Sequence, residues 1–496
     1  MTKKKVFNAL LIASLILMPF TAMADLGNVI AKSNDIEISM FGSLKTLPQF
    51  MTNVDFNSDD TRYDYIIDEN GPMMNHSVRN EARVGWEGKG TNWDFLVILE
   101  ADYTLNKVNV DRQAGSNNTS SAAYNPEAVT ANSDDFGIEK LNFGYDFGPA
   151  KLNTGWNTKF LDLMTGALIY ADDHPYIGAT GKAGNMTWEA LYLIIQDDVY
   201  NIRSDADADG YADAEDRAVG YDSNRLDWRA YTLRAGFDIK GFTLAPIYAF
   251  SNNEMRKADV HYLGLEGFGK LGKITPRFEL SYAFGDQDVS GGENLDISAY
   301  AAFAAIEIEI SKAVVPYVGG YYLSGDDDGN DRDINAYNGI SMNQRYTPTF
   351  GMENAFIYRF IPVLGSNIYE NNFQNLGSDP GYGGSSNGAR GDAPGMIMLG
   401  AGVQGAITEK MNYKTQVMYF TLAEENNFMK ASDATQTVGD EVGIEFDLQL
   451  AYNYSTHFSI GNTVSVFLPG DFVEDYRGSD YDDTAIMDTV ELSWKF

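Results

Sequence analysis

The chain has 496 residues, a net charge of −34, 48 glycines and no cysteine. The lack of cysteine excludes disulfides, thiolate metal sites and covalently attached c-type haem. So acidic a chain repels nucleic acid, and we expect no DNA or RNA partner. Soluble proteins of this length usually split into several domains. No Pro-rich or Ser-rich linker interrupts this sequence, which favours one large repetitive β structure.

The first 24 residues have the pattern of a secretory signal peptide. Lysines 3–5 precede an apolar run from Val6 to Phe20, and Ala22-Met23-Ala24 supplies the small residues that a signal peptidase recognises. A membrane anchor is the alternative, but the apolar run is shorter than the ~20 residues that a helical span requires. We therefore expect residues 1–24 to be cleaved, leaving residues 25–496 as the exported domain.

From residue 36 onward, apolar and polar residues alternate in short runs. A strand near residues 79–87 is separated from one near 95–103 only by Gly88 to Asn92, and short connections that contain glycine are typical of hairpin turns. Long connections rich in Asn, Ser and Asp, such as 109–134 and 203–225, follow the hairpins. Counting the runs in this way predicts about 18 strands.

The alternation of short turns and long loops predicts an all-β fold, a transmembrane antiparallel β-barrel with short periplasmic turns and long external loops. An even strand number brings the last strand back beside the first, so no backbone edge is left unpaired in lipid. The strand near Ile444, Phe446 and Leu448 carries Glu445 and Asp447 on its other face. One face therefore suits lipid and the other suits an aqueous lumen.

Two further expectations follow if lipid surrounds the barrel and water fills its lumen. The barrel should have no conventional hydrophobic core. Tryptophans near strand ends should belong to the aromatic girdles of the membrane interfaces; these are Trp86, Trp93, Trp188, Trp228 and Trp494.

The chain ends on a strand in which Val490, Leu492, Trp494 and Phe496 alternate with polar residues. This ending resembles the C-terminal signal of bacterial outer-membrane β-barrels, whose last strand ends in Phe. The resemblance implies a location in the outer membrane of a Gram-negative cell. Lipid and lipopolysaccharide would then surround the barrel. The sequence is also compatible with a homo-oligomer.

Residues 205–216 have the ligand order of an EF-hand-type calcium loop. Carboxylates occupy loop positions 1, 3, 5, 9 and 12, with glycine at 6 and a backbone carbonyl at 7. Asp at the last position replaces the usual Glu, which resembles the calcium loops of dockerins and thrombospondin type 3 repeats. We expect a structural Ca²⁺ ion here, the alternative being a solvated acidic loop. The ligands would be Asp205, Asp207, Asp209, Tyr211, Asp213 and Asp216.

The stretch Tyr-Leu-Ser-Gly-Asp-Asp-Asp at residues 322–328 resembles the alginate-export family, which often has such a turn before its longest loop. Chain length and strand count are similar to that family too, and the resemblance implies an arginine-lined pore for a polyanion. The charges assigned to the lumen in this sequence have both signs. The predicted pore-lining residues are Arg79, Glu81, Arg83, Glu100, Lys140, Lys151, Arg234, Arg277, Glu279, Glu307, Glu309, Lys414, Glu445 and Asp447.

The long connection from about residue 327 to 395 contains an apolar patch that begins at Phe356. Long loops without repeated structure are usually functional or disordered. We expect the patch to fold into the barrel as a constriction or to pack on neighbouring loops, with Phe356, Tyr358 and Phe360 as constriction residues, and residues 161–170 to do the same. A disordered tip or a contact between protomers is the alternative.

An enzymatic site needs a constellation that this sequence lacks. His76, His174, His261 and His457 are scattered, and no nucleophile elbow or zinc-binding histidine pair accompanies them. An outer-membrane phospholipase would need His261 beside a serine on the lipid face.

The sequence therefore predicts a non-enzymatic porin, a passive channel for ions and small hydrophilic solutes whose acidic mouth prefers cations. The alternatives are a substrate-specific polysaccharide (alginate-like) exporter gated by the long loop, and a barrel that sheathes a partner.

Overall fold

The computed structural model describes residues 28–33, 35–53, 56–58, 67–68, 71–72, 78–104, 137–199, 226–254, 257–288, 294–327, 331–342, 344–356, 394–424 and 429–496. The predicted signal peptide, the predicted calcium loop at 205–216, and the constriction residues Tyr358 and Phe360 lie outside these ranges.

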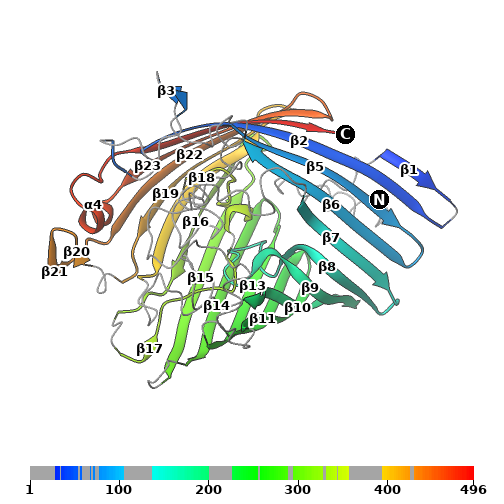
Figure 1. Cartoon of the computed structure of the whole chain (residues 1–496), viewed down its shortest axis with the longest axis horizontal. Coiled ribbons are helices and arrows are strands. Elements are labelled where there is room, and N and C mark those ends of the chain that lie inside the picture. Colours follow the sequence, from blue (N-terminus) through cyan, green and yellow to red (C-terminus); the bar gives the residue numbers. More distant parts are fainter. Residues whose placement is uncertain are drawn as a thin grey trace, which may run out of the picture.

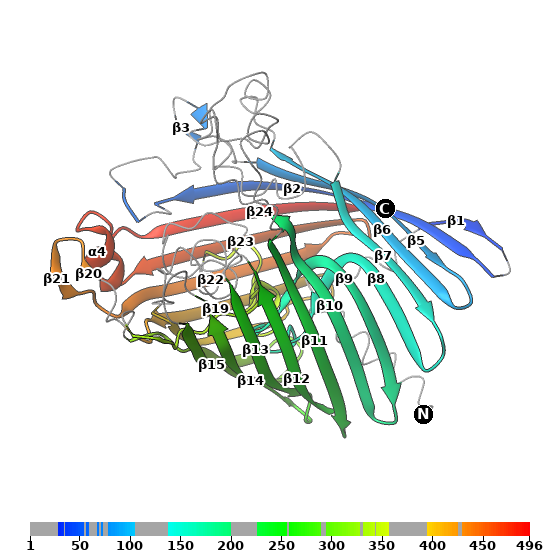
Figure 2. The ribbon, with the colours of Figure 1, turned by 60° about the horizontal axis from the view of Figure 1, so that its bottom comes forward.

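Eighteen antiparallel strands form a closed barrel, as Figures 1 and 2 show and as the sequence predicts. β2 pairs with β5 along one edge and with β24 along the other, so the first and last barrel strands meet. Closure leaves no unpaired edge around the wall. The barrel strands are β2 (Glu37–Thr52), β5 (Val78–Lys89), β6 (Trp93–Thr104), β7 (Gly137–Asp146), β8 (Ala150–Phe160), β9 (Ala171–Ala183), β10 (Met186–Val199), β11 (Leu226–Ile239), β12 (Phe242–Asn253), β13 (Ala258–Gly269), β14 (Ile274–Gln287), β15 (Leu295–Ile308), β16 (Val315–Leu323), β18 (Met396–Ala406), β19 (Met411–Thr421), β22 (Glu441–Asn453), β23 (Phe458–Pro469) and β24 (Ala485–Lys495).

Shorter elements decorate this barrel. β1 (Asn28–Lys32) pairs with the start of β2, and β17 (Asp333–Ile334) runs parallel to β15. β3 (Ile67–Asp68) pairs with β4 (Gly71–Pro72), and β20 (Met429–Lys430) pairs with β21 (Asp433–Thr437). The helical pieces are η3 (Gln344–Tyr346) and α4 (Asp471–Arg477). Among the described residues, no helix is both long and apolar enough to cross a membrane.

Tight turns join the strands in pairs at one end of the barrel. The β11–β12 turn consists of Lys240 and Gly241, both with positive φ, which is the backbone geometry that suits a two-residue hairpin. Asp238 Oδ1 accepts the N–H of Gly241 at 2.8 Å and supports the turn. The longer connections, such as the one between β16 and β18, begin and end at the other end of the barrel.

The outward face of the strands is apolar and exposed. Leu233, Leu280 and Leu399 are 51%, 52% and 61% exposed, whereas Arg277 and Glu279 on the opposite face of β14 are buried. An apolar band outside and a polar lining inside are the pattern of a barrel that is surrounded by lipid.

The prediction that the barrel has no conventional core is wrong. Residues 161–170 and residues 331–356 fold into the lumen and bury inward-facing apolar side chains of the wall. Examples are Tyr262, Met398 and Phe420, all fully buried. The error arose because a lumen filled with folded chain offers an apolar interior, which an empty lumen would not.

One of the expected girdle tryptophans also faces inward. Trp228 is 3% exposed, and its indole N–H donates to Ser251 Oγ at 2.8 Å. It pairs with Asn253 across the sheet and shares its face with Ala230 and Thr232, which are buried too. The phase of β11 therefore places this tryptophan in the core and not in a membrane girdle.

Candidate functional site

Two segments inside the lumen join to form one body. We call residues 161–170 the first segment, residues 331–356 apart from residue 343 the second segment, and the two together the infolded unit. Ile340 donates its N–H to Ile169 O at 2.8 Å, and the N–H of Ala171 donates to Ser341 O at 2.9 Å. Tyr337 donates its hydroxyl to Leu168 O at 3.1 Å. Infolding of the first segment, which the sequence predicts, is confirmed.

Side chains of the barrel wall, chiefly carboxylates, form hydrogen bonds with the first segment. Glu279 Oε2 on β14 accepts the N–H of Gly166 and the hydroxyl of Thr165, each at 2.7 Å. Arg277, on the same strand, donates from Nη1 to Met164 O at 3.0 Å. The segment therefore presents N–H and hydroxyl donors mainly to an acidic wall.

The Asp162 side chain forms hydrogen bonds with the other end of the first segment. Its Oδ2 accepts the N–H of Ile169 at 2.6 Å, and its Oδ1 accepts the N–H of Tyr170 at 3.3 Å. Burial raises the pKa of the Asp162 carboxyl, and these N–H donors oppose that rise only in part.

Donors on the wall hold the second segment. Lys414 Nζ on β19 donates to Gly351 O at 2.7 Å and to Pro348 O at 3.3 Å. Gln416 Nε2, two residues along the same face, donates to Phe350 O at 3.1 Å. At β19 the loop contributes carbonyl oxygens and the wall contributes donors, the reverse of the contacts between the first segment and Glu279.

Phe356 ends the described part of the second segment and packs into an aromatic cluster. Its ring centroid lies 5.2 Å from that of Phe467 and 5.6 Å from that of Phe56, and all three rings are fully buried. Its N–H donates to Ser465 Oγ at 2.9 Å. Phe356 is therefore buried in the fold, and its role as a constriction residue stays a prediction.

Most residues of the predicted pore-lining set lie on the inner face of the wall. The cross-strand register places them there because they share a face with groups that bond the infolded unit. Glu309 differs, since it follows β15 in the tight turn and pairs with Lys270. The inner-face members are Arg79, Glu81, Arg83, Glu100, Lys140, Lys151, Arg234, Arg277, Glu279, Glu307, Lys414, Glu445 and Asp447.

Opposite charges pair across the inner face, either on neighbouring strands or, for β11 and β13, across the strand that lies between them. Arg277 Nε lies 3.1 Å from Glu307 Oε1, and Arg234 Nε donates to Glu266 Oε1 at 2.8 Å. Lys45 Nζ lies 3.2 Å from Glu81 Oε1. These pairs neutralise much of the buried charge locally, so a lining of mixed sign also serves the structure of the wall.

Several residues of this site were missing from the sequence-based set. Asp162 is the only acidic residue in an apolar run, which is the one signal that could have singled it out. Lys45 and Glu266 belong to strands that the alternation predicts, but nothing local marks them. Phe56 and Ser465 meet Phe356 only through the closed fold.

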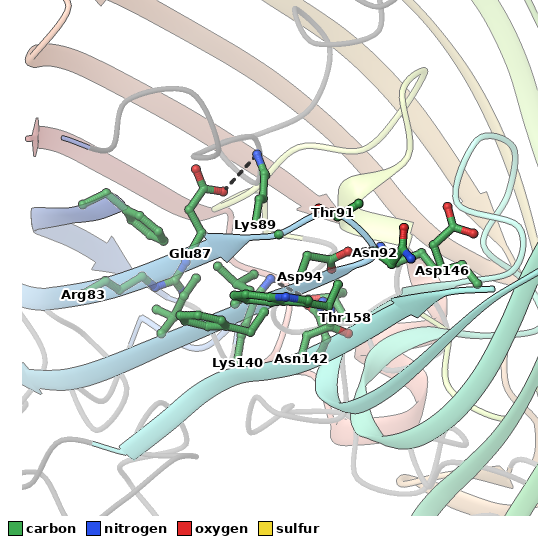
Figure 3. A pocket seen from close by; sticks show the side chains of 18 of the residues that line it. Arg83, Glu87, Lys89, Thr91, Asn92, Asp94, Lys140, Asn142, Asp146 and Thr158 are labelled. Atoms are coloured by element: carbon green, nitrogen blue, oxygen red, sulfur yellow. Dashed lines mark hydrogen bonds and ion pairs between the residues drawn. The ribbon is translucent and has the colours of Figure 1, made fainter. Parts of the chain in front are cut away.

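A cavity of about 630 Å³ lies near the tight-turn end and is lined mainly by residues of β5 to β8. Figure 3 shows Arg83, Lys140 and Asp94 from three of these strands around it. Lys151 Nζ pairs with Asp94 Oδ2 at 2.6 Å, and Lys140 Nζ donates to Thr158 Oγ1 at 2.8 Å. The cavity is thus a polar space with charges of both signs.

The described histidines lie on separate elements. The His174 ring on β9 bonds the hydroxyl of Tyr170 at 2.8 Å, and the His261 ring on β13 bonds that of Tyr248 at 2.9 Å. His457 lies in the β22–β23 turn, with Nδ1 at 3.0 Å from Lys495 O. The hydrogen-bond partner of His261 is therefore a tyrosine and not the serine that a phospholipase would need.

No family model matches the chain, and no curated protein matches it either. Among solved structures, OccAB3 of Acinetobacter baumannii is 10% identical with a TM-score of 0.51, over 92% of this chain and 99% of that chain. A BenF-like porin from Pseudomonas fluorescens Pf-5 is 10% identical with a TM-score of 0.49, over 93% and 98%. OccK11 (OpdR) of Pseudomonas aeruginosa is 8% identical with a TM-score of 0.49, over 93% and 96%.

The likeness to OccAB3 agrees with a porin-like β-barrel fold. At this identity it concerns the fold alone. The resemblance to the alginate-export family gains no support from these structures.

Proposed function

We propose that the protein is an outer-membrane channel of the porin type, through which ions and small hydrophilic solutes diffuse passively. The observation that carries the proposal is a closed barrel with a charged inner face, whose lumen the described residues of the infolded unit narrow from one side. The unit bonds to β9, β13, β14, β15, β19 and β23, whereas the polar cavity is lined mainly by β5 to β8. Solute would pass along that side, where the wall charges act at close range.

The proposal includes the finer expectations from the sequence. Residues 1–24 direct export and are removed, and lipid and lipopolysaccharide of a Gram-negative outer membrane surround the barrel. The net charge of −34 gives the mouth a preference for cations. The predicted pore-lining set sets selectivity, and Ca²⁺ bound at residues 205–216 orders an external loop. Oligomeric state stays open, and no observation specifically favours the polysaccharide exporter.

Conductance in a planar bilayer under a KCl gradient tests the channel and its selectivity. We expect steady current from folded barrels, with a reversal potential on the cation-selective side. Heat-denatured protein is the control for leakage. If folded barrels carried no current, an open channel would be excluded, and the remaining alternatives would be a barrel that sheathes a partner or a gated exporter.

Calorimetric titration with Ca²⁺ tests the proposed loop. Because Asp209 occupies a central ligand position, Asp209→Ala should abolish heat of binding that the wild type shows. Asp480→Ala, in another acidic stretch, is the matched control and should retain it. Equal titration curves for all three proteins would exclude binding at residues 205–216.

A further inference from the structure

Where the first segment contacts the wall, buried acidic side chains outnumber the basic side chains that pair with them. Asp162, Glu266 and Glu279 are each at most 1% exposed. Glu266 is paired with Arg234. The neighbouring cation, Arg277, is paired with Glu307 and also bonds a backbone carbonyl. Among the residues that the structure describes, Asp162 and Glu279 therefore have no basic side chain as an ion-pair partner.

The Thr165 hydroxyl lies 2.7 Å from Glu279 Oε2 and 3.1 Å from both Asp162 O and Glu266 Oε2, so the three acidic residues belong to one buried cluster. Within this cluster, the side chains of Asp162 and Glu279 are hydrogen-bond neighbours. Glu279 Oε2 is occupied by donors from Thr165 and Gly166, while its Oε1 is buried without a donor from the described residues. Two carboxylates that touch in a desolvated site cannot both be ionised, because neither has a hydrogen to donate. A hydrogen atom between them removes both the repulsion and the unsatisfied oxygen.

A metal ion is the other species that could fill such a gap. In the described part of the chain, no three acidic, histidine or cysteine groups have an arrangement that could hold one. The pair also has too few oxygens free of other bonds for a hard cation, which prefers six or more oxygen ligands. A proton suits the geometry better.

We propose that Asp162 and Glu279 share one proton, and that this pair is a pH-sensitive switch that holds the infolded unit in the lumen. When the proton leaves to solvent, two adjacent negative charges remain in a buried site. The first segment is then pushed from the wall, and the second segment, bonded to it through Ile169 and Ser341, loses that support.

The surrounding charges set the direction of the switch. Glu266 on β13 opposes loss of the proton, while the cations Arg234 on β11 and Arg277 on β14 are paired with Glu266 and with Glu307 on β15. Burial raises the pKa of Asp162, so the proton persists above the pH at which an ordinary Asp loses it. Stabilisation of the unit is therefore present at low pH and is lost as pH rises through the raised value.

Infrared spectroscopy of the folded protein tests the shared proton directly and does not depend on any channel activity. We expect the absorption band of a protonated carboxyl group at neutral pH, and its loss or marked decrease in Glu279→Gln and in Asp162→Asn. Asp259→Asn is the matched control, because Asp259 is exposed and bonds only Asn252 among the described contacts. A wild-type spectrum without such a band, or a band unchanged in both variants, would overturn the proposal.

Bilayer conductance between about pH 4 and about pH 9 tests the switch, and this arm rests on the proposed channel function. The wild type and Asp259→Asn should show a rise in conductance as pH increases. Glu279→Gln should stay at the low-pH level throughout, because its amide offers a permanent N–H to Asp162. Asp162→Asn is the second variant should Glu279→Gln not fold. A pH-dependent rise in conductance that persists in the folded variants would refute the switch. Absence of current at every pH would count against the channel function, and the infrared measurement alone would then test the shared proton.

Discussion

The two segments of the infolded unit are held in the same lumen by opposite chemistry. The first segment gives N–H and hydroxyl groups to wall carboxylates such as Glu279. The second gives carbonyl oxygens to Lys414 and Gln416 on β19, and only at other strands, through groups such as the Thr349 hydroxyl, does it donate to the wall. Both arrangements satisfy buried polar groups, which a folded protein requires of any chain in its interior.

The difference lies in where the compensating charge comes from. Near the second segment, the ammonium group of Lys414 lies close enough to Asp447 and Glu307 to interact with both. Near the first segment, the described residues leave no such cation for Asp162 and Glu279, and the proposed shared proton takes that place. The donor at one attachment is thus a lysine side chain, and the donor at the other is a proton shared between two carboxyl groups.

The largest expected effect comes from removing the side chain of Lys414. Lys414→Met leaves Gly351 O and Pro348 O without this donor and removes the cation that neighbours the buried carboxylate of Asp447. Breaking a buried charged contact from one side costs about 3–5 kcal/mol. We expect a lower thermal unfolding temperature and a higher conductance, measured by differential scanning calorimetry and in planar bilayers.

Lys410→Met is the matched control for that variant. Lys410 Nζ also donates to a backbone carbonyl, Tyr454 O at 3.0 Å, but in an exposed turn far from the infolded unit. It should change neither quantity appreciably. Equal behaviour of the two lysine variants would break the comparison, because Lys414 would then not hold the second segment.

Truncation of Phe356 tests the apolar end of the second segment. Phe356→Ala removes a fully buried ring from its contacts with Phe56 and Phe467. A cavity of that kind costs about 3 kcal/mol. Chemical denaturation in detergent should show the loss, and Phe356→Leu should recover most of it. A variant as stable as the wild type would mean that the segment is held by its polar contacts alone.

The hydroxyl of Thr165 tests the polar attachment of the first segment to the wall. Thr165→Val keeps the shape of the side chain but removes the donor to Glu279 Oε2. Because a buried acceptor is left with one donor fewer, we expect a loss of about 1–2 kcal/mol, measured by the same denaturation. The effect should grow as pH rises, since the first segment is then also losing its proton. A loss that is independent of pH would separate Thr165 from the proposed switch.

The smallest effect concerns the external loops, where acid and not alkali should act. Although partial burial works in the opposite direction, the hydrogen bonds from Lys430 and from the N–H of Gly439 lower the pKa of Asp475. The contact is therefore complete above the ordinary pKa of Asp and is lost as pH falls through the lowered value.

Trypsin cleavage after Lys430 at neutral pH measures that contact. Asp475→Asn should speed cleavage, while Asp480→Asn, whose described side-chain contact is with Ser479 alone, should not. Cleavage at the same rate in both variants and the wild type would show that the ion pair does not order this hairpin.

Much of the barrel could be predicted from the sequence, because each strand carries its own signal. The alternation near Ile444 and Glu445 fixes which side chains face lipid, and the turn at Lys240 and Gly241 fixes where one hairpin reverses. Closure of the barrel follows from the even number of strands, which brings β24 beside β2.

The contacts of the candidate site could be predicted only in part, because they join residues that are distant in the sequence. The apolar character of residues 161–170 and of Phe356 indicated infolding, but not that Ile340 would bond Ile169. Trp228 and Phe420 carried the same apolar signal as lipid-facing residues, and only the folded segments inside the barrel decide their burial.

The most direct test of the account is the conductance of wild-type and Lys414→Met barrels, side by side in a planar bilayer. We predict a small steady current from the wild type and a clearly larger one from the variant, because its second segment is no longer held against β19. No current from either protein, although both are folded, would contradict a channel narrowed by the infolded unit. Equal currents would show that the unit does not limit the flow.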